Sequence, residues 1–393
     1  MTAFSRRVLA AKPSASLAVT ARAIQLKREG RDIVSLSVGE PDFPVFPHVA
    51  QAVEDALRKG YTKYTPSSGI AELREAISDW MEGEVGQRYA IAQIVCTAGA
   101  KQALYNACQA LLDEGDEAVI PNPYWVSYPD IVRLAGATPV EMTARAEDEW
   151  HPHPDALDRA ITPRTKVVML GSPSNPTGAV WSTETMRAIA KVLEKHPRIT
   201  ILSDDIYHRL VYGGARACNI LEVAPQLRDR TVLINGCSKA YAMTGLRLGW
   251  ACGPQEIIAA MGKVQDSSTS NPNSLTQYAA VAALRGPQDG VEAMRKQFER
   301  WRDLMVDVVR AIPRVRCARP EGAYYVFCDV SAYLGRVPDD VKLSQLLLEE
   351  HGVAVVPGSA FGQAGYLRLS FATSEAMIRS GVDRLSRGLQ SLV

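Results

Sequence analysis

The sequence predicts an α/β protein with a large three-layer α/β/α domain, built on a mostly parallel sheet, and a smaller α+β domain. Between about residues 49 and 284, short apolar segments alternate with helical patterns. This alternation is typical of a parallel sheet with helices on both faces. The chain has 393 residues, which is more than one hydrophobic core usually serves, so we expect two domains.

The strands of the large domain are expected where short apolar runs occur, at residues 94–96, 117–120, 165–170, 199–203, 231–235 and 248–252. Helical patterns lie between several of these runs. In the segment 99–112, apolar residues recur at spacings of three and four, which is the pattern of one buried helix face. The segment 183–196 shows the same pattern and predicts a second helix.

The C-terminal part of the chain has a different pattern. A long charged helix is expected over 291–312, and short mixed segments follow at 321–330, 342–358 and 365–372. This mixture predicts the smaller α+β domain. We therefore place an N-terminal arm with part of the small domain at 1–45, the large domain at 46–285 and the small C-terminal domain at 286–393.

Composition narrows the classes of partner. Lys and Arg number 44 against 43 Asp and Glu, a net charge of +1, so we expect neither nucleic acid nor an anionic membrane as the main partner. No apolar run approaches the roughly 18 residues that span a bilayer. The seven cysteines include no C-x-x-C pair. This favours reduced thiols in a cytoplasmic protein over disulfides or a zinc site, and we expect no metal.

Unusual residues follow the expected strands where each strand ends. "TAGAKQ" follows 94–96, "PNPYWVSY" comes after 117–120 and "GSPSNPTG" after 165–170, while Asp204 follows 199–203 and "GCSK" follows 231–235. Ligands of open α/β sheets bind beyond the carboxyl ends of the strands. We therefore expect these five segments to line one crevice.

Three of these segments have an ordinary interpretation as well as a functional one. Asp204 is either a helix N-cap or a buried carboxylate that needs a cation beside it. Gly99 and Ala100 form either a plain turn or a helix start that binds phosphate. Trp125 is either a core residue or a flat cover for an aromatic cofactor.

Three further polar residues have similar alternatives. Asn175 lies in a loop fixed by prolines, either in a plain turn or as a donor and acceptor for a ligand. Lys101 opposes the helix dipole, so its ammonium either extends to water or faces an anionic ligand. Arg368 alternates with two leucines, either as a surface strand residue or as a bidentate clamp for a carboxylate.

Lys239 is the candidate nucleophile. A lysine amine reacts near neutral pH when burial or a neighbouring cation such as Arg247 lowers its pKa, and small neighbours such as Ser238 would let a substrate reach it. An amine, a buried carboxylate, a phosphate cradle, a stacking aromatic and a carboxylate clamp together suit pyridoxal phosphate.

Eight motifs carry a resemblance to a known family over nearly the whole chain: "SVGEPDF", "TKYTPSSGIAELREAI", "TAGAKQAL", "PYWVSYP", "SPSNPTG", "SDDIY", "CSKAYAMTGLRLGW" and "LRLSFATS". The chain resembles the fold-type I pyridoxal-phosphate aminotransferases of class I/II, and within them the prokaryotic aspartate aminotransferases, including those that also use prephenate. The resemblance implies a cytoplasmic homodimer with shared active sites that exchanges amino groups between amino acids and 2-oxo acids.

The resemblance also implies a role for each matching residue. Lys239 forms the Schiff base with the cofactor and moves the proton, and Asp204 pairs with the ring nitrogen. The remaining cofactor contacts are implied for Tyr207 and Asn175 at the ring oxygen, Trp125 over the ring, Gly99, Ala100, Lys101, Ser238 and Arg247 around the phosphate, and Tyr64 from the partner subunit. Substrate contacts are implied for Gly39, Trp125, Asn175, Lys101, Arg7 and Arg368, which would clamp the α-carboxylate.

The chain departs from the family pattern at some positions. Gly236 stands where many aspartate aminotransferases have a serine, so one phosphate hydrogen bond is expected to be missing. Lys101 is like the lysine that binds the distal carboxylate in the prokaryotic subgroup, and Arg7 is like an arginine of the members that accept prephenate. "EPDFPVFPHV" differs from the commoner "EPDFDTP".

The motifs favour an aminotransferase for acidic amino acids and leave alternatives open. These are a broad, aromatic, alanine, arginine or prephenate aminotransferase, or a lyase or synthase on the same fold. The same fold also occurs as a sensor module in transcription regulators. Such regulators carry a winged-helix segment, for which we expect no room because the family pattern begins within the first dozen residues.

Overall fold

The structure is a computed structural model that describes residues 4–12 and 15–392. Its centre is a seven-stranded sheet in the order β2 (Ile94–Thr97), β8 (Gly249–Cys252), β7 (Thr231–Gly236), β6 (Thr200–Asp204), β5 (Thr165–Gly171), β3 (Glu117–Asn122) and β4 (Thr138–Thr143). All pairs from β7 to β4 are parallel, whereas β8 is antiparallel to both of its neighbours. The predicted mostly parallel sheet is confirmed.

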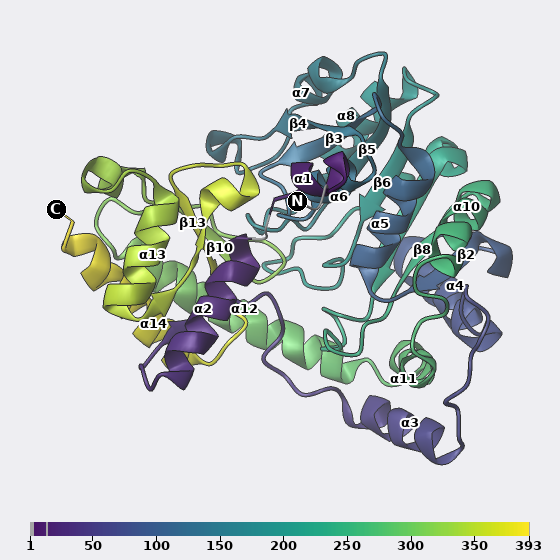
Figure 1. Cartoon of the computed structure of the whole chain (residues 1–393), viewed down its shortest axis with the longest axis horizontal. Helices are drawn as coiled ribbons and strands as arrows, with labels where there is room; N and C mark the ends of the chain where they lie inside the picture. The colour runs from purple at the N-terminus through teal and green to yellow at the C-terminus, as the bar shows by residue number, and fades with distance from the viewer. Residues whose placement is uncertain (1–3, 13–14, 393) are drawn as a thin grey trace.

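The sheet is covered by helices on both faces. Successive residues of β5 point to opposite sides, so that Val168 packs in one core with α4 (Ala71–Val85), α8 (Thr183–Glu194) and α11 (Ser274–Arg285). Val167 packs in the other core with α5 (Ala100–Leu111), α6 (Tyr128–Leu134) and α10 (Gln255–Asp266). These are the three layers that the alternating pattern predicted. Figure 1 shows α5 lying across the strands.

The predicted strands and helices of this part are present, with ends that differ by a few residues. Strand β4 was not predicted. It lies at the edge of the sheet and pairs only with β3, and most of its residues are partly or fully exposed. Pro139 and Glu141 therefore interrupt the apolar pattern without breaking the strand, because an edge strand tolerates proline.

The C-terminal part contains a four-stranded antiparallel sheet in the order β12 (Val356–Pro357), β13 (Tyr366–Ser370), β10 (Tyr325–Asp329) and β9 (Arg316–Cys317). Three helices share a core with it: α12 (Asp289–Arg310), α13 (Asp340–His351) and α14 (Glu375–Gln390). In Figure 1 the long helix α12 leads from α11 to this part of the molecule. The long charged helix and the mixed segments after it are thus confirmed as elements.

The N-terminal segment contacts both parts. Helix α1 (Arg6–Ala10) packs against α6, whereas α2 (Ala15–Arg28) packs near β11 (Val353–Ala354), to which β1 (Val34–Ser35) pairs in parallel. The other helices are α3 (Pro47–Arg58), α7 (Pro154–Ala160) and α9 (Ile220–Val223). The division of the chain at residues 45 and 285 stays a prediction. Within the described ranges, no helix is long and apolar enough to cross a membrane.

Candidate active site

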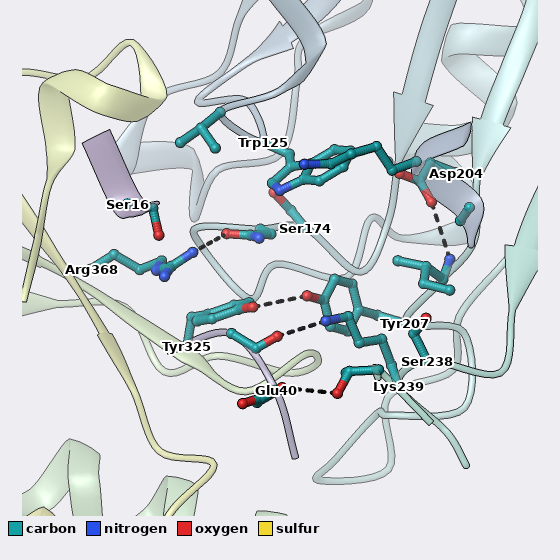
Figure 2. A pocket seen from close by; sticks show the side chains of 18 of the residues that line it. Ser16, Glu40, Trp125, Ser174, Asp204, Tyr207, Ser238, Lys239, Tyr325 and Arg368 are labelled. Carbon is teal, nitrogen blue, oxygen red and sulfur yellow. Dashed lines mark hydrogen bonds between the residues drawn. The ribbon is translucent and has the colours of Figure 1, made fainter. Parts of the chain in front are cut away.

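The main cavity has a volume of about 470 Å³ and lies where the parallel strands of the large sheet end. The large sheet supplies Asp204 at the end of β6 and Lys239 in the loop between β7 and β8, while β13 of the small sheet supplies Arg368. Helix α2 adds Ser16 and Thr20 to the wall. Figure 2 shows these walls facing one another across the cavity.

Lys239 is held by backbone and ring contacts. Its Nζ donates a hydrogen bond of 2.6 Å to the carbonyl of Gly39 and lies 5.8 Å from the ring centre of Tyr207 and 5.7 Å from that of Tyr324. Burial lowers the pKa of the Lys239 amine to about 8, opposed by Glu40. About a tenth of this amine is therefore unprotonated at pH 7, far more than for a lysine with an ordinary pKa.

Asp204 lines the cavity and is 7% exposed. Its Oδ2 accepts a hydrogen bond of 2.8 Å from the hydroxyl of Tyr128, and its Oδ1 accepts one of 3.4 Å from the N–H of Ile206. Burial raises the pKa of Asp204 to about 6, against the lowering by these two hydrogen bonds and by Lys239. The helix N-cap interpretation is wrong, because a turn and not a helix follows Asp204.

An anion cradle lies between β2 and β8. Gly99 has a φ of +90°, and a Cβ on it would lie 2.6 Å from Nη2 of Arg247. Arg247 also has a positive φ of +57° and donates to the carbonyls of Thr244 and Ala98 at 2.7 and 3.2 Å. The arginine thus lies against the N-terminus of α5, which begins at Ala100 and carries the positive end of the helix dipole.

The absence of a hydroxyl at position 236 has a steric reason. A Cβ on Gly236 would lie 2.8 Å from the carbonyl oxygen of Leu248 and 2.9 Å from Cα of Gly249. Both contacts are with backbone, which cannot move aside as a side chain can. The close pairing of β7 and β8 therefore leaves no room for a serine, and the cradle consists of Arg247 and the start of α5.

Arg368 is buried at 3% exposure, so the interpretation as a surface strand residue is wrong. Its Nη1 donates to Oδ1 of Asn175 at 3.1 Å and its Nη2 to the carbonyl of Ser37 at 2.7 Å. The guanidinium lies 4.4 Å from the ring centre of Tyr325 and 5.0 Å from that of Phe361. Its Nε has no hydrogen-bond partner within the described part of the chain.

Lys101 and Trp125 form one corner of the cavity. The ammonium of Lys101 lies 4.9 Å from the ring centre of Trp125 and lines the cavity, although the residue as a whole is exposed. Burial and the nearby Arg247 both lower the pKa of this ammonium. Together with Lys239 and Arg368 the cavity wall has four basic side chains, against the carboxylates of Asp204 and Glu40, and this balance favours anionic ligands.

Most of the predicted site residues meet at this cavity. Gly39, Ala100, Lys101, Trp125, Asn175, Asp204, Tyr207, Ser238, Lys239, Arg247 and Arg368 line it. Gly99, Arg7 and Tyr64 are not among the lining residues, although Gly99 directly precedes Ala100, which is one of them. Arg7 is exposed on α1, and Tyr64 is 91% exposed, so their predicted roles stay predictions.

The structure adds lining residues that sequence reasoning missed: Ser16, Thr20, Tyr128 and Tyr325. Tyr128 belongs to the quoted "PYWVSY" segment and Tyr325 to "EGAYYVFCDV". The sequence signal for Tyr128 and Tyr325 was a tyrosine within or near an unusual motif. This signal does not reveal which side chain each tyrosine contacts across the cavity.

The sheet order, the lysine after β7 and the carboxylate after β6 define the fold-type I class of pyridoxal-phosphate enzymes. Within that class, the family model "Aminotransferase class I and II" matches residues 31–385. The chain belongs to this family and is a transaminase.

Relatives with closely similar sequences cover the whole length. The chain is 44% identical to an aspartate aminotransferase of Geobacillus stearothermophilus over 98% of this chain and 99% of that protein. It is 46% identical to an aspartate/prephenate aminotransferase of Cereibacter sphaeroides over 95% of each. The solved structure of an aspartate aminotransferase of Thermus thermophilus with maleate has 44% identity and a TM-score of 0.93, over 99% of this chain and all of that one.

Members of this family use pyridoxal phosphate, and the residues present fit it. The glycine at position 99 leaves space beside Arg247 that a Cβ would fill, which suits a phosphate group. Asp204 is a buried carboxylate that suits a protonated ring nitrogen, and Trp125 offers a flat face. Lys239 supplies the amine that an aldehyde requires.

Proposed function

We propose that this chain is a pyridoxal-phosphate aminotransferase that moves the amino group of aspartate or glutamate to a 2-oxo acid such as 2-oxoglutarate by a ping-pong mechanism. The observation that carries the acidic substrate is that Arg368 and Lys101 provide two cations in one cavity, in addition to Arg247. A monocarboxylic substrate would need only one of them. The relatives named aspartate aminotransferases support this substrate.

The cofactor contacts follow from the residues at the cavity. Arg247, Ser238 and the N–H groups after Gly99 would hold the phosphate, and Asp204 would hold the ring nitrogen. Trp125 would cover the ring, and Tyr207 with Asn175 would bond the ring oxygen. When bound, pyridoxal phosphate supplies a ring that withdraws electrons from the α-carbon of the amino acid.

The chain's own residues bind the substrate and move its proton. Arg368 binds the α-carboxylate through a planar guanidinium, which suits two parallel hydrogen bonds. Lys239 would take the proton from the α-carbon and return it to the carbon on the other side of the amino nitrogen, since an amine with a pKa of about 8 works as base and as acid near neutral pH. Asp204 has a pKa of about 6 and stays mostly ionised at pH 7, so it can keep the ring nitrogen protonated.

A second copy of the chain would complete the site. Tyr64 is 91% exposed, and apolar side chains of the N-terminal segment, such as Phe4, Leu9 and Leu17, are also exposed at 65–67%. These features support a homodimer in which Tyr64 of one subunit reaches the phosphate of the other. The seven cysteines form no disulfide, which supports the cytoplasm as the compartment.

Acceptance of prephenate is the second candidate. It is favoured by the relatives of this chain that are named aspartate/prephenate aminotransferases, at 44–46% identity. The predicted helper Arg7 is exposed on α1 and does not line the cavity. Prephenate as amino acceptor, tested beside 2-oxoglutarate and oxaloacetate, decides this candidate.

The test of the acidic substrate is Lys101→Ala. Its KM for aspartate is expected to rise about 10- to 100-fold, the size expected for a lost hydrogen bond to a charged group, while KM for alanine changes less than about twofold. The measurement is a half-reaction scan in which the protein with bound pyridoxal phosphate is mixed with each amino acid and its absorbance followed.

The matched control is Lys191→Ala, which removes an exposed lysine of α8 that does not line the cavity. Equal losses of Lys101→Ala for aspartate and alanine would rule out the acidic specificity. If no amino acid changed the absorbance of pyridoxal phosphate bound to the unaltered protein, the aminotransferase function would be ruled out.

A further inference from the structure

Tyr325 lines the cavity between the residues of the small sheet and those of the large sheet. It is the first residue of β10, is 1% exposed, and lines the cavity on the side of the small sheet. Strand β10 pairs with β13, which carries Arg368. Figure 2 shows Tyr325 between Arg368 and Tyr207.

The ring of Tyr325 supports the guanidinium of Arg368. The two are 4.4 Å apart, and Phe361 lies 5.0 Å from the same guanidinium. Aromatic faces attract a cation, and the attraction grows when water is excluded, as it is at a 3% exposed arginine. The ring contacts therefore fix the guanidinium in addition to its hydrogen bonds to Asn175 and Ser37.

The hydroxyl of Tyr325 contacts the other side of the site. It lies 2.9 Å from the hydroxyl of Tyr207. A Cβ on Gly39 would lie 2.7 Å from the same oxygen, so the glycine leaves the space that this hydroxyl fills. One side chain thus touches the residue proposed to clamp the substrate and the residue proposed to bond the cofactor's ring oxygen.

We infer that Tyr325 is a positioning residue that fixes Arg368 through its ring and orients the Tyr207 hydroxyl through its own hydroxyl. This inference rests on the proposed function, because it concerns how that site is held. With Tyr325 donating to Tyr207, the Tyr207 hydroxyl is free to donate to a ring oxygen. Hydrogen bonds in such a chain strengthen one another.

Two substitutions separate the two contacts. Tyr325→Phe keeps the ring and removes the hydroxyl, so maleate, a dicarboxylate probe, should bind within about twofold of the original affinity. The pH midpoint of the bound pyridoxal phosphate absorbance should rise by about half a unit, because a weaker donor from Tyr207 stabilises the ionised ring oxygen less. The other charged or titratable side chains near Tyr207 are Lys239, Arg368 and Tyr324, and all three are unchanged in the Tyr325→Phe variant.

Tyr325→Leu removes the ring as well. Maleate should then bind about tenfold more weakly, and KM for aspartate should rise by a similar factor, which is the size of a desolvated cation–π contact. The kcat at saturating aspartate should stay within about twofold, and the absorbance midpoint should match that of Tyr325→Phe.

Tyr212 provides the matched control. It is also 1% exposed, its hydroxyl donates to the carbonyl of Ala323, and its ring lies 5.2 Å from the guanidinium of Arg302. It lies outside the cavity. Tyr212→Phe and Tyr212→Leu therefore remove the same kinds of contact and should change neither maleate affinity nor the absorbance midpoint.

The outcomes separate this inference from the proposed function. If the unaltered protein transaminates aspartate but the Tyr325 and Tyr212 variants behave alike, the positioning role is refuted and the function stands. If Tyr325→Phe leaves the midpoint in place, the hydroxyl role is refuted even when Tyr325→Leu does not fold. If the unaltered protein does not bind pyridoxal phosphate, the function fails and this inference with it.

Discussion

The two arginines of the cavity are held in contrasting surroundings. Arg247 is exposed, and its guanidinium donates to the backbone carbonyls of Thr244 and Ala98. Arg368 is 3% exposed and lies beside two aromatic rings. One side of the site is thus formed by backbone and glycine at the strand ends of the large sheet, and the other by packed side chains of the small sheet and the segment before β13.

This contrast shows where the site is sensitive to shape. A charge in a dry pocket interacts more strongly with a ligand carboxylate than one in water. The slot beside two rings also suits a flat guanidinium and not a lysine ammonium. We therefore expect the Arg368 side to be sensitive to the type of side chain at that position. The Arg247 side should be sensitive mainly to added side-chain volume.

Lys239→Ala gives the largest expected effect, because the reaction proposed for this site depends on the Lys239 amine. Turnover should fall by about 10⁴-fold or more, since the base and nucleophile are lost together, while pyridoxal phosphate still binds weakly through the cradle. Steady-state rates and equilibrium dialysis measure the two quantities, and Lys191→Ala is the control. A variant that transaminates at a near-normal rate would overturn the assignment of the site.

Replacing each arginine by lysine tests the contrast directly. Arg368→Lys should lower kcat/KM for aspartate by about 10²-fold, through lost charge-assisted and ring contacts. Arg247→Lys should weaken pyridoxal phosphate binding by about tenfold or less, because an exposed lysine can still approach a phosphate. Steady-state rates and cofactor titrations of the two variants measure these effects. Effects of equal size would show that burial does not make Arg368 more sensitive to replacement than Arg247.

The pH dependence of cofactor capture tests the amine between the two arginines. Burial, Arg368 and Arg247 lower the pKa of Lys239 to about 8, so the reactive neutral amine increases with pH up to that value. The capture rate of added pyridoxal phosphate by cofactor-free protein should fall about tenfold per pH unit below the pKa and level off above it.

Stopped-flow absorbance between pH 6 and 10 measures this rate, and N-acetyl-lysine is the reference because its amine keeps gaining reactivity up to about pH 10.4. A capture rate that rises in parallel with the reference up to that pH would contradict a lowered pKa for Lys239.

Gly99→Ala tests the space on the Arg247 side and is the smallest expected effect. Gly99 has a φ of +90° and a ψ of 158°, which is nearly restricted to glycine, so an L-residue there costs about 1–3 kcal/mol of unfolding free energy. The new Cβ at 2.6 Å from Arg247 should displace the guanidinium and weaken cofactor binding about threefold. Gly30→Ala is the control, since Gly30 has a φ of +85° and nothing within 4 Å of a Cβ. Equal cofactor affinity in both variants would exclude a steric role for Gly99.

The large-sheet side was predictable from the sequence, and the other side was predictable only in part. Lys239 and Asp204 follow apolar runs, and parallel strands bring their ends to one edge by geometry alone. The alternation around Arg368 showed that it points away from its leucine neighbours but not what covers that face. The cover is Tyr325 and Phe361, whose positions depend on packing between elements.

Because a chain is synthesised from its N-terminus, strand β1 must wait for β11 before the two can pair. Strand β1 near the N-terminus pairs with β11, and Arg368 is the last lining residue along the chain. Lys239, Asp204 and the cradle are therefore synthesised well before Arg368, which lines the other side of the cavity. A growing chain that meets pyridoxal phosphate has no finished place for a substrate, so transamination begins only after translation is almost complete.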